Sequence, residues 1–453
     1  MEMDKTVGRN KIAALFDSGT FVETGAYLGR ADGSKVGAIC GYGAINGKLT
    51  YAFVQDGDRQ KGAFDALQAK KIAGLYEMAL KNGAPVIGVF DSIGAYVGDG
   101  ASALSAYGTL LGVIAKASGA IPQIALVTGV CSGMSASAAA MFDVVVTVKD
   151  QSSLSVNAPF LIGKEVGNAE FAAENGLSSI LAASESEAFA KARELIALLP
   201  ANCEEGVSVE EIADDVNRLV AVEGLTGKAL ASAVADGGAF IELADAYAKE
   251  LTVGFARIGG VCCGIVASNA NVNGGVITAS AARKAAKLIG LCDSFGLPVI
   301  TLVDSEGVAA DKKEESSPLA SALGTLAMAY ANADTAKITV VVGKAYGAAF
   351  TLLGSRALGA DLVYAVKDAC ISVLSPDSAV AFLWNDRITE ERSRADLVLE
   401  WKNTCASAET AAADGNVDDL IDATELRARI CSAVYMLLCK GEPRFGMHSN
   451  LPL

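Results

Sequence analysis

The sequence predicts an α/β protein made of two tandem domains related by internal duplication. Three observations lead to this prediction. Strings of residues recur at a nearly constant displacement, and apolar stretches too continuous for half-exposed strands alternate with helical patterns. The 453 residues also exceed what one hydrophobic core usually serves. We therefore expect two similar domains, each with a buried sheet covered by helices.

The repeat sets the order of the expected elements. Four pairs of segments recur in the same order: 17–23 with 236–242, 69–95 with 282–308, 123–136 with 337–350, and 143–150 with 361–368. The longest pair is displaced by 213 positions, so that Asp91 falls on Asp304 and Gly94 falls on Gly307. Each of its segments reads as helix, turn, buried strand and loop. Stacked βαβ units are the expected result.

The domain boundaries follow from this repeat. We place the first domain at residues 1–235 and the second at 236–453. Residues 163–235 are rich in Ala, Glu and Asp at helical spacing and are predicted to form connecting helices, including 184–199 and 208–220. Their acidic runs are expected to be solvated helix faces.

Composition excludes several classes of function. A net charge of -15 leaves no basic face for nucleic acid. The first residues lack the pattern of a signal peptide, so the ten cysteines predict a reduced, cytoplasmic chain. No Cys-x-x-Cys pair occurs, and Cys262 and Cys263 fit a buried strand, so no metal site is expected. The apolar stretch 118–148 is interrupted by Pro122 and Asp143 and predicts strand, loop, helix and strand.

Histidine-dependent chemistry is also disfavoured. The one histidine, His448, stands in a polar tail, where a solvated side chain is the expected reading. A Ser-His-Asp or Cys-His site would need this tail to fold back into a cleft. The string 41–47 lacks the third glycine of a dinucleotide fingerprint, and 340–347 lacks the spacing of a phosphate loop.

Two loops in each copy carry the candidate chemistry. One apolar strand ends in Asp-Ser-x-Gly, at 91–94 and again at 304–307. A second strand ends in a loop of small residues that opens a helix, at 129–136 and 343–349. Small residues leave backbone N–H groups unshielded, and a helix start directs its N–H groups at an anion. Such a pair suits an oxyanion hole, although one copy alone would be read as a tight turn.

At this point the sequence resembles a known family over residues 16–430. It is similar to the carboxyltransferase subunits of biotin-dependent acyl-CoA carboxylases, such as propionyl-CoA carboxylase beta chains, and to the related sodium-pump decarboxylases. The resemblance rests on five stretches: 41–56, 121–133, 253–271, 291–307 and 343–350. It implies two crotonase-like (ClpP/crotonase) domains, each a β-β-α superhelix.

The resemblance also implies that the two copies bind different substrates. The first copy would bind a CoA thioester, and the second would bind carboxybiotin carried on a separate protein or domain. The ureido group of biotin takes the α-proton in this chemistry, so no side-chain base or metal is needed. The implied acyl-side hole consists of Gly94, Ala95, Gly133 and Met134; the biotin-side hole consists of Gly307, Val308, Gly347, Ala348 and Ala349. Thr351 matches a position that helps select the acyl chain.

The chain departs from the family pattern at both holes. The family usually shows Ser-Gly-Gly-Ala-Arg at 92–96 and Val-Pro-Gly-Phe at 305–308. It also shows a glycine pair where this chain has Gly133 with Met134, and another where it has Gly347 with Ala348. Backbone N–H groups survive such changes of side chain.

We expect carboxyl transfer between biotin and a small acyl-CoA, in a direction that the sequence leaves open. One alternative is the alpha subunit of a sodium-pump decarboxylase of the methylmalonyl-CoA or glutaconyl-CoA type, at the edge of a membrane complex. Another is a catalytically silent scaffold of the same fold. A third is a crotonase-like hydratase or hydrolase with Glu306 as general acid/base, although we prefer to read Glu306 as a rim or ion-pair residue.

The expected partners follow from what the sequence lacks. No Met-Lys-Met biotin attachment site occurs, so a biotin carboxyl carrier protein should deliver the biotin. A biotin carboxylase subunit or membrane decarboxylase subunits would complete the complex. The resemblance further implies a homodimer, or a trimer of dimers, whose site spans two subunits.

Overall fold

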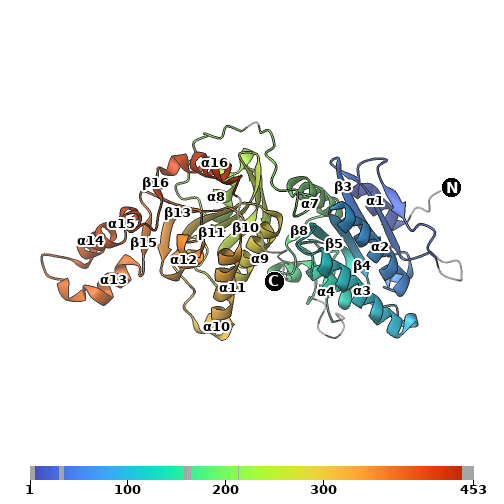
Figure 1. Ribbon diagram of the computed structural model, residues 1–453. Coiled ribbons are helices and arrows are strands. Elements are labelled where there is room, and N and C mark those ends of the chain that lie inside the picture. The colour runs from blue at the N-terminus through green and yellow to red at the C-terminus, as the bar shows by residue number, and fades with distance from the viewer. Residues whose placement is uncertain are drawn as a thin grey trace. The chain divides into compact units, whose positions relative to one another are not determined.

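The computed structural model describes residues 6–440 apart from 30–34, 158–160, 162, 164 and 213. By their contacts these residues divide into two compact units, the first ending at Gly206 and the second beginning at Val207. Each unit contains one mixed sheet with helices packed against it (Figure 1). The predicted α/β class is confirmed.

The sheet of the first unit has the strand order β1-β2-β3-β4-β5-β6-β8, with β7 paired to β5. The first three strands are antiparallel, and from β3 onward the strands pair in parallel. The strands are β1 (Val22–Thr24), β2 (Ala38–Ile45), β3 (Lys48–Gln55), β4 (Val86–Ser92), β5 (Gln123–Ser132), β6 (Val144–Val148), β7 (Ser153–Ser155) and β8 (Ile180–Ala182). The helices are α1 (Val7–Leu15), α2 (Ala66–Asn82), α3 (Ala101–Ala117), α4 (Met134–Ala140), α6 (Ala169–Glu174) and α7 (Glu185–Leu198).

The second unit repeats this topology, with the order β9-β10-β11-β12-β13-β14-β16 and β15 paired to β13. Its strands are β9 (Phe240–Leu243), β10 (Leu251–Ile258), β11 (Val261–Ser268), β12 (Val299–Ser305), β13 (Lys337–Tyr346), β14 (Leu362–Val366), β15 (Cys370–Ser372) and β16 (Asp419–Ile421). Its helices are α8 (Gly227–Val234), α9 (Ala279–Phe295), α10 (Lys312–Ser316), α11 (Leu319–Asn332), α12 (Ala348–Leu352), α13 (Pro376–Leu383), α14 (Arg394–Cys405), α15 (Ala408–Ala413) and α16 (Leu426–Leu437). Each strand of one unit has a counterpart in the other, which confirms the duplication.

The long helices that precede β4 and β12 begin and end with the same local devices. The Asp65 carboxylate accepts an N–H of the first turn of α2 at 2.8 Å, and the Thr278 hydroxyl does so for α9 at 3.0 Å. Both helices end at a glycine in the left-handed conformation, Gly83 with φ 56° and Gly296 with φ 68°. These caps set where the next strand starts.

The core of the first unit lies around its parallel strands. The ring of Phe90 meets those of Phe53 and Phe142 edge-on, with centroids 5.5 Å apart in both pairs. A Cβ on Gly88 would lie 2.6 Å from the Phe53 ring, so glycine is required there. The stretch 118–148 forms β5, α4 and β6, as predicted. Of the helices that the structure describes, none has the length and apolar character needed to cross a membrane.

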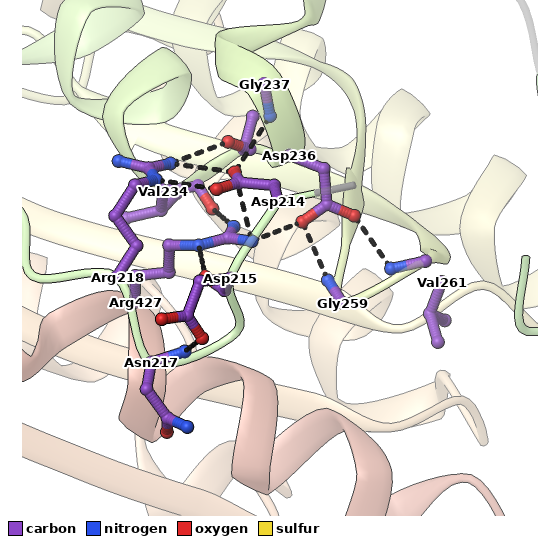
Figure 2. Close-up of polar contacts among 12 residues, drawn as sticks. Asp214, Asp215, Asn217, Arg218, Val234, Asp236, Gly237, Gly259, Val261 and Arg427 are labelled. Atoms are coloured by element: carbon purple, nitrogen blue, oxygen red, sulfur yellow. Dashed lines mark hydrogen bonds and ion pairs between the residues drawn. The ribbon is translucent and has the colours of Figure 1, made fainter. Parts of the chain in front are cut away.

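A duplicated clamp joins the last helix of each unit to a hairpin. In the first unit the Asp17 carboxylate accepts hydrogen bonds from the N–H groups of the β2–β3 turn. Arg193 of α7 donates hydrogen bonds to Asp17 at 2.6 Å and to the Leu15 carbonyl at 2.7 Å. In the second unit Asp236 accepts the N–H groups of the β10–β11 turn. Here Arg427 of α16 donates to Asp236 at 2.7 Å and to the carbonyl at the end of α8 at 2.6 Å (Figure 2).

The segment before α8 differs from its prediction. The helix expected at 184–199 is present as α7, but the described residues of 208–220 are not helical. Asp214 instead accepts hydrogen bonds from Arg218 at 2.9 Å and lies 3.2 Å from the Arg427 guanidinium (Figure 2). The prediction that the acidic residues of 208–220 form a solvated helix face was therefore wrong, because the Asp214 carboxylate forms ion pairs with Arg218 and Arg427.

The second unit accordingly begins earlier than the predicted boundary at 235/236. The chain changes unit at Gly206, and α8, which was expected to be a connector, is the counterpart of α1. Both helices come just before the aspartate of their clamp, and Arg193 and Arg427 bind the carbonyls of their last residues. The sequence similarity was too weak there to reveal that α8 belongs to the second copy.

Candidate functional site

In each unit the two candidate loops lie against one another at the carboxyl ends of neighbouring parallel strands. The pairing of β4 with β5 shifts register at Phe90/Ser92, and that of β12 with β13 shifts at Val303/Ser305. A Cβ on Gly94 would lie 3.7 Å from the Ser132 carbonyl oxygen. The register shifts therefore bring each Asp-Ser-x-Gly loop next to the small-residue loop of its neighbour.

The first loop leaves one N–H group unused. Gly94, with φ 110°, donates its N–H to the Ser92 hydroxyl at 3.2 Å, and its carbonyl accepts the Phe64 N–H at 2.8 Å. The Tyr96 N–H returns to the Phe64 carbonyl at 2.8 Å. In this parallel bridge the N–H of the residue between them, Ala95, is directed away from Phe64. It has no hydrogen-bond partner among the described residues.

The second loop leaves another N–H group at the start of α4. Gly133 has φ 67° and ψ −135°, a conformation that residues with a side chain rarely adopt. Its N–H donates to the Ser155 carbonyl at 3.1 Å, and its carbonyl accepts from Ala136 at 3.1 Å. Met134 is the first residue of the helix, so its N–H has no partner within the helix and none elsewhere in the described part of the chain.

The second unit repeats this hydrogen bonding. Gly307 donates to the Ser305 hydroxyl at 3.3 Å, and its carbonyl accepts the Ile277 N–H at 2.9 Å. Gly347 donates to the Ser372 carbonyl at 2.9 Å. Within residues 207–440, apart from 213, no partner is found for the N–H groups of Val308 and Ala348. Ala349, the remaining candidate, is fully buried in α12.

The predicted site residues therefore play two parts. The four glycines use their N–H groups within the loops, whereas those of Ala95 and Met134, and of Val308 and Ala348, have no partner among the described residues. Such pairs suit a developing oxyanion. Groups of three or more metal-ligating side chains do not occur in the described residues. His448 lies outside the described residues.

Two aspartates at the strand ends were aligned by the repeat but given no role. The Asp91 carboxylate packs directly against Gly129, because a Cβ on Gly129 would lie only 2.2 Å from the Asp91 Oδ1 atom. Asp304 packs against Gly343 in the same way, with a corresponding distance of 2.4 Å. Asp91 pairs with the buried Lys11 ammonium at 3.1 Å, whereas Asp304 accepts the backbone N–H of the residue after Gly343 at 2.9 Å. Each aspartate thus fixes the strand that leads into the second loop. The alignment of Asp with Gly in both copies was the available signal.

The rims of the two loop pairs differ in polarity. In the first unit Ile93, Val130 and Met134 are exposed by 51%, 38% and 40%. At the positions equivalent to Ile93 and Val130, the second unit has Glu306 and Lys344, whose side chains form an ion pair at 2.6 Å. The hydrogen bond that the Lys344 ammonium donates to Glu306 raises the pKa of Lys344. The preferred reading of Glu306 as an ion-pair residue is confirmed.

A pocket of about 840 Å³ opens beside the second loop pair. Thr351, the candidate for acyl-chain selection, lines it from α12. Apolar side chains from α12, β15, α13, α14 and the loop after β15 contribute most of the rest: Phe350, Ile371, Val373, Leu374, Phe382, Leu383 and Trp401. Val373 and Phe382 are 83% and 79% exposed. This side of the second unit therefore presents apolar surface next to the paired N–H groups.

Comparison with known proteins gives one consistent result. A family model described as "Carboxyl transferase domain" matches residues 1–449. The chain is 32% identical to a putative propionyl-CoA carboxylase beta chain of Bacillus subtilis, over 99% of this chain and 94% of the relative. It is 30% identical to the methylmalonyl-CoA decarboxylase subunit alpha of Veillonella parvula, over 99% and 93%.

A solved structure agrees with the duplicated fold. The hexameric transcarboxylase 12S, with methylmalonyl-coenzyme A and methylmalonic acid bound, superposes with a TM-score of 0.91. It is 31% identical, and the match covers 98% of this chain and 92% of that one. The crotonase-like character of both domains is thereby confirmed.

Proposed function

Because the chain belongs to the carboxyl transferase family, the carboxyltransferases of biotin-dependent acyl-CoA carboxylases and decarboxylases, we propose that it moves a carboxyl group between carboxybiotin and a small acyl-CoA. The observation that carries this proposal is a pair of N–H groups that have no hydrogen-bond partner in the described part of the chain, and this pair recurs at equivalent loops in both units. Two anions arise in such a transfer, one on each substrate. A chain with two similar holes suits that chemistry.

The first unit would hold the thioester. The N–H groups of Ala95 and Met134 bind the thioester oxygen and stabilise the enolate that forms when the α-proton leaves. The second unit would hold the biotin ring, with its ureido oxygen on the N–H groups of Val308 and Ala348. Bound carboxybiotin supplies the carboxyl group and, once decarboxylated, the base. Protein side chains then have no proton to move, in keeping with a sequence that holds a single histidine.

A small acyl group suits the rim of the first hole. Ile93, Val130 and Met134 offer exposed apolar surface beside the Ala95 and Met134 N–H groups. We infer that the acyl chain covers these side chains and that Thr351 limits its size from the second unit of a neighbouring chain. The relatives named for propionyl-CoA and methylmalonyl-CoA support a substrate of this size.

The expected partners and assembly follow from the assignment of the thioester to the first unit and of biotin to the second. Biotin would arrive on a biotin carboxyl carrier protein, together with a biotin carboxylase subunit or membrane decarboxylase subunits. We propose a cytoplasmic homodimer or trimer of dimers in which the first unit of one chain meets the second unit of its mate. The exposed Val373 and Phe382 suit burial in such an interface, and the transcarboxylase relative is a hexamer.

A ligand panel tests the proposal. Thermal unfolding of the purified chain would be followed with acetyl-, propionyl-, methylmalonyl- and glutaconyl-CoA, and separately with biotin. A ligand that binds at 100 times its Kd stabilises the fold by about 2.7 kcal/mol, so the preferred CoA ester should raise the Tm clearly. If none of the esters raised the Tm, the chain would be the silent scaffold. Decarboxylation of methylmalonyl-CoA or glutaconyl-CoA with free biotin, without carboxylation of propionyl-CoA, would favour the decarboxylase alternative.

A further inference from the structure

The second hole carries a charged pair that the first hole lacks. Glu306 and Lys344 stand on the two strand ends that lead to the Val308 and Ala348 N–H groups. Their ion pair is 2.6 Å long. The residues at these places in the first unit are Ile93 and Val130, which are apolar. The duplicated fold thus offers an internal comparison, because these two positions are charged at one hole and apolar at the other.

The backbone fixes both members of this pair. The Lys344 N–H donates to Asp304 at 2.9 Å, and the Glu306 N–H donates to the Gly274 carbonyl at 3.0 Å. A Cβ on Gly274 would lie 2.8 Å from the Glu306 carboxyl carbon, so glycine makes room for this carboxylate. The pair is therefore a built feature of the loop.

The same pair is easy to separate. Both side chains are 49% exposed, and an ion pair at such a surface contributes about 0–1 kcal/mol. Lys344 also lines a pocket of about 820 Å³, together with Asp368, Asp377, Arg394 and Lys402. An incoming carboxylate could replace Glu306 on the ammonium at little cost.

We propose that Lys344 binds the carboxylate of the carboxylated biotin, and that Glu306 is a positioning residue that occupies the ammonium when this ligand is absent. This inference rests on the proposed function of the second hole. The ureido oxygen would lie on the Val308 and Ala348 N–H groups while the carboxylate pairs with Lys344. When the C–N bond breaks, its electrons stay on the ureido nitrogen and the carboxylate departs as neutral CO2. Lys344 then returns to Glu306.

Equilibrium binding separates this role from a structural one. Two ligands would be titrated by calorimetry: biotin methyl ester, which has no carboxylate, and N1′-carboxymethyl biotin methyl ester, whose carboxylate cannot leave as CO2. Lys344→Met should weaken binding of the carboxylated ligand by about tenfold, as expected for the loss of a charge-assisted hydrogen bond. Binding of biotin methyl ester should change by less than about twofold.

Three further variants test whether the affinity for the carboxylated ligand changes in the expected direction. Lys344→Arg should restore most of the affinity for the carboxylated ligand, and Glu306→Gln should raise that affinity above wild type by removing its competitor. Lys402→Met, in the same pocket, is the control and should leave both ligands unaffected. If wild type bound neither ligand, the assignment of the second hole to biotin would fail. If wild type bound both and Lys344→Met weakened them equally or not at all, only the role of Lys344 would be refuted.

Discussion

The clamps of the two units are made of the same bonds but differ in their access to water. In the first unit the side chains of Arg193 and Asp17 are 26% and 30% exposed. In the second unit those of Arg427 and Asp236 are 0% and 8% exposed. In the second unit the segment around Asp214 and Arg218 contributes a second ion pair to the clamp (Figure 2). The two clamps therefore share their geometry but differ in burial, and a buried ion pair loses more when one partner is removed than an exposed pair does.

The largest expected effect is on stability. Arg427→Met would leave the carboxylates of Asp236 and Asp214 without their shared cation, and breaking a buried pair in this way costs about 3–5 kcal/mol. Arg193→Met breaks a partly exposed pair and should cost only about 0–1 kcal/mol. For a unit of this size, the first change should lower the Tm by on the order of 10 °C.

Differential scanning calorimetry measures both variants under the same conditions. Methionine is used in each because it keeps most of the aliphatic stem and removes the guanidinium, with both its charge and its hydrogen-bond donors. Equal losses of Tm for the two variants would contradict the idea that burial separates the clamps.

The next effect concerns activity at the two holes. Gly133→Val and Gly347→Val place a β-branched residue at φ 67° and φ 54°, so the backbone must move and carry the N–H of Met134 or Ala348 with it. We expect each to lower its own half-reaction at least tenfold, a loss of about 1.4 kcal/mol or more in transition-state stabilisation. Gly133→Val should impair CoA-dependent turnover, and Gly347→Val should impair decarboxylation of free carboxybiotin.

Matched controls separate hole geometry from general strain. Gly19 and Gly224 also have positive φ, at 77° and 72°, and the space beside them is open. Gly19→Val and Gly224→Val should lower stability without changing either half-reaction. The oxyanion holes would be mere turns if Gly133→Val and Gly347→Val kept normal rates in both assays.

A smaller effect tests whether one site needs two chains. Mixing inactive Gly133→Val and Gly347→Val chains under subunit exchange should yield mixed dimers with one intact site of two. Because half of the dimers formed at random are mixed, activity should recover to about a quarter of wild type. Mass spectrometry confirms the exchange. Exchange without recovery would place both halves of each site in one chain.

The sequence predicted best where the two copies resemble each other. The repeat of Asp91 and Gly94 in Asp304 and Gly307 located both first loops, because tight turns need particular residues. It did not separate the glycines, whose N–H groups are consumed in the loops, from Ala95 and Val308, whose N–H groups are available. That distinction depends on the bridge partners Phe64 and Ile277, which lie far from Ala95 and Val308 in the sequence and bind the residues on either side of them.

The prediction failed where tertiary contacts override local pattern. Residues 208–220 have helical spacing, but their described residues are not helical, and the Asp214 carboxylate forms ion pairs with Arg218 and with Arg427 of α16. The clamp was missed for a related reason. Arg193 and Arg427 lie 234 positions apart, outside the displacement of 213 that reveals the rest of the repeat.

The smallest effect is the response of the clamps to acid. Hydrogen bonds from the Gly47 N–H and from Arg193 lower the pKa of Asp17, and the hydrogen bond from Arg218 lowers that of Asp214. A carboxyl group whose pKa is lowered by folding stabilises the fold above its unfolded pKa of about 3.9, and this contribution is lost as pH falls through the lower folded value. Asp17→Asn and Asp214→Asn should therefore lie below wild type in Tm at pH 7 and approach it below about pH 3. The Asp214 gap should be the larger, because its side chain is 15% exposed against 30% for Asp17. A gap that widened on acidification would show that these carboxylates are not held in the charged form by the fold.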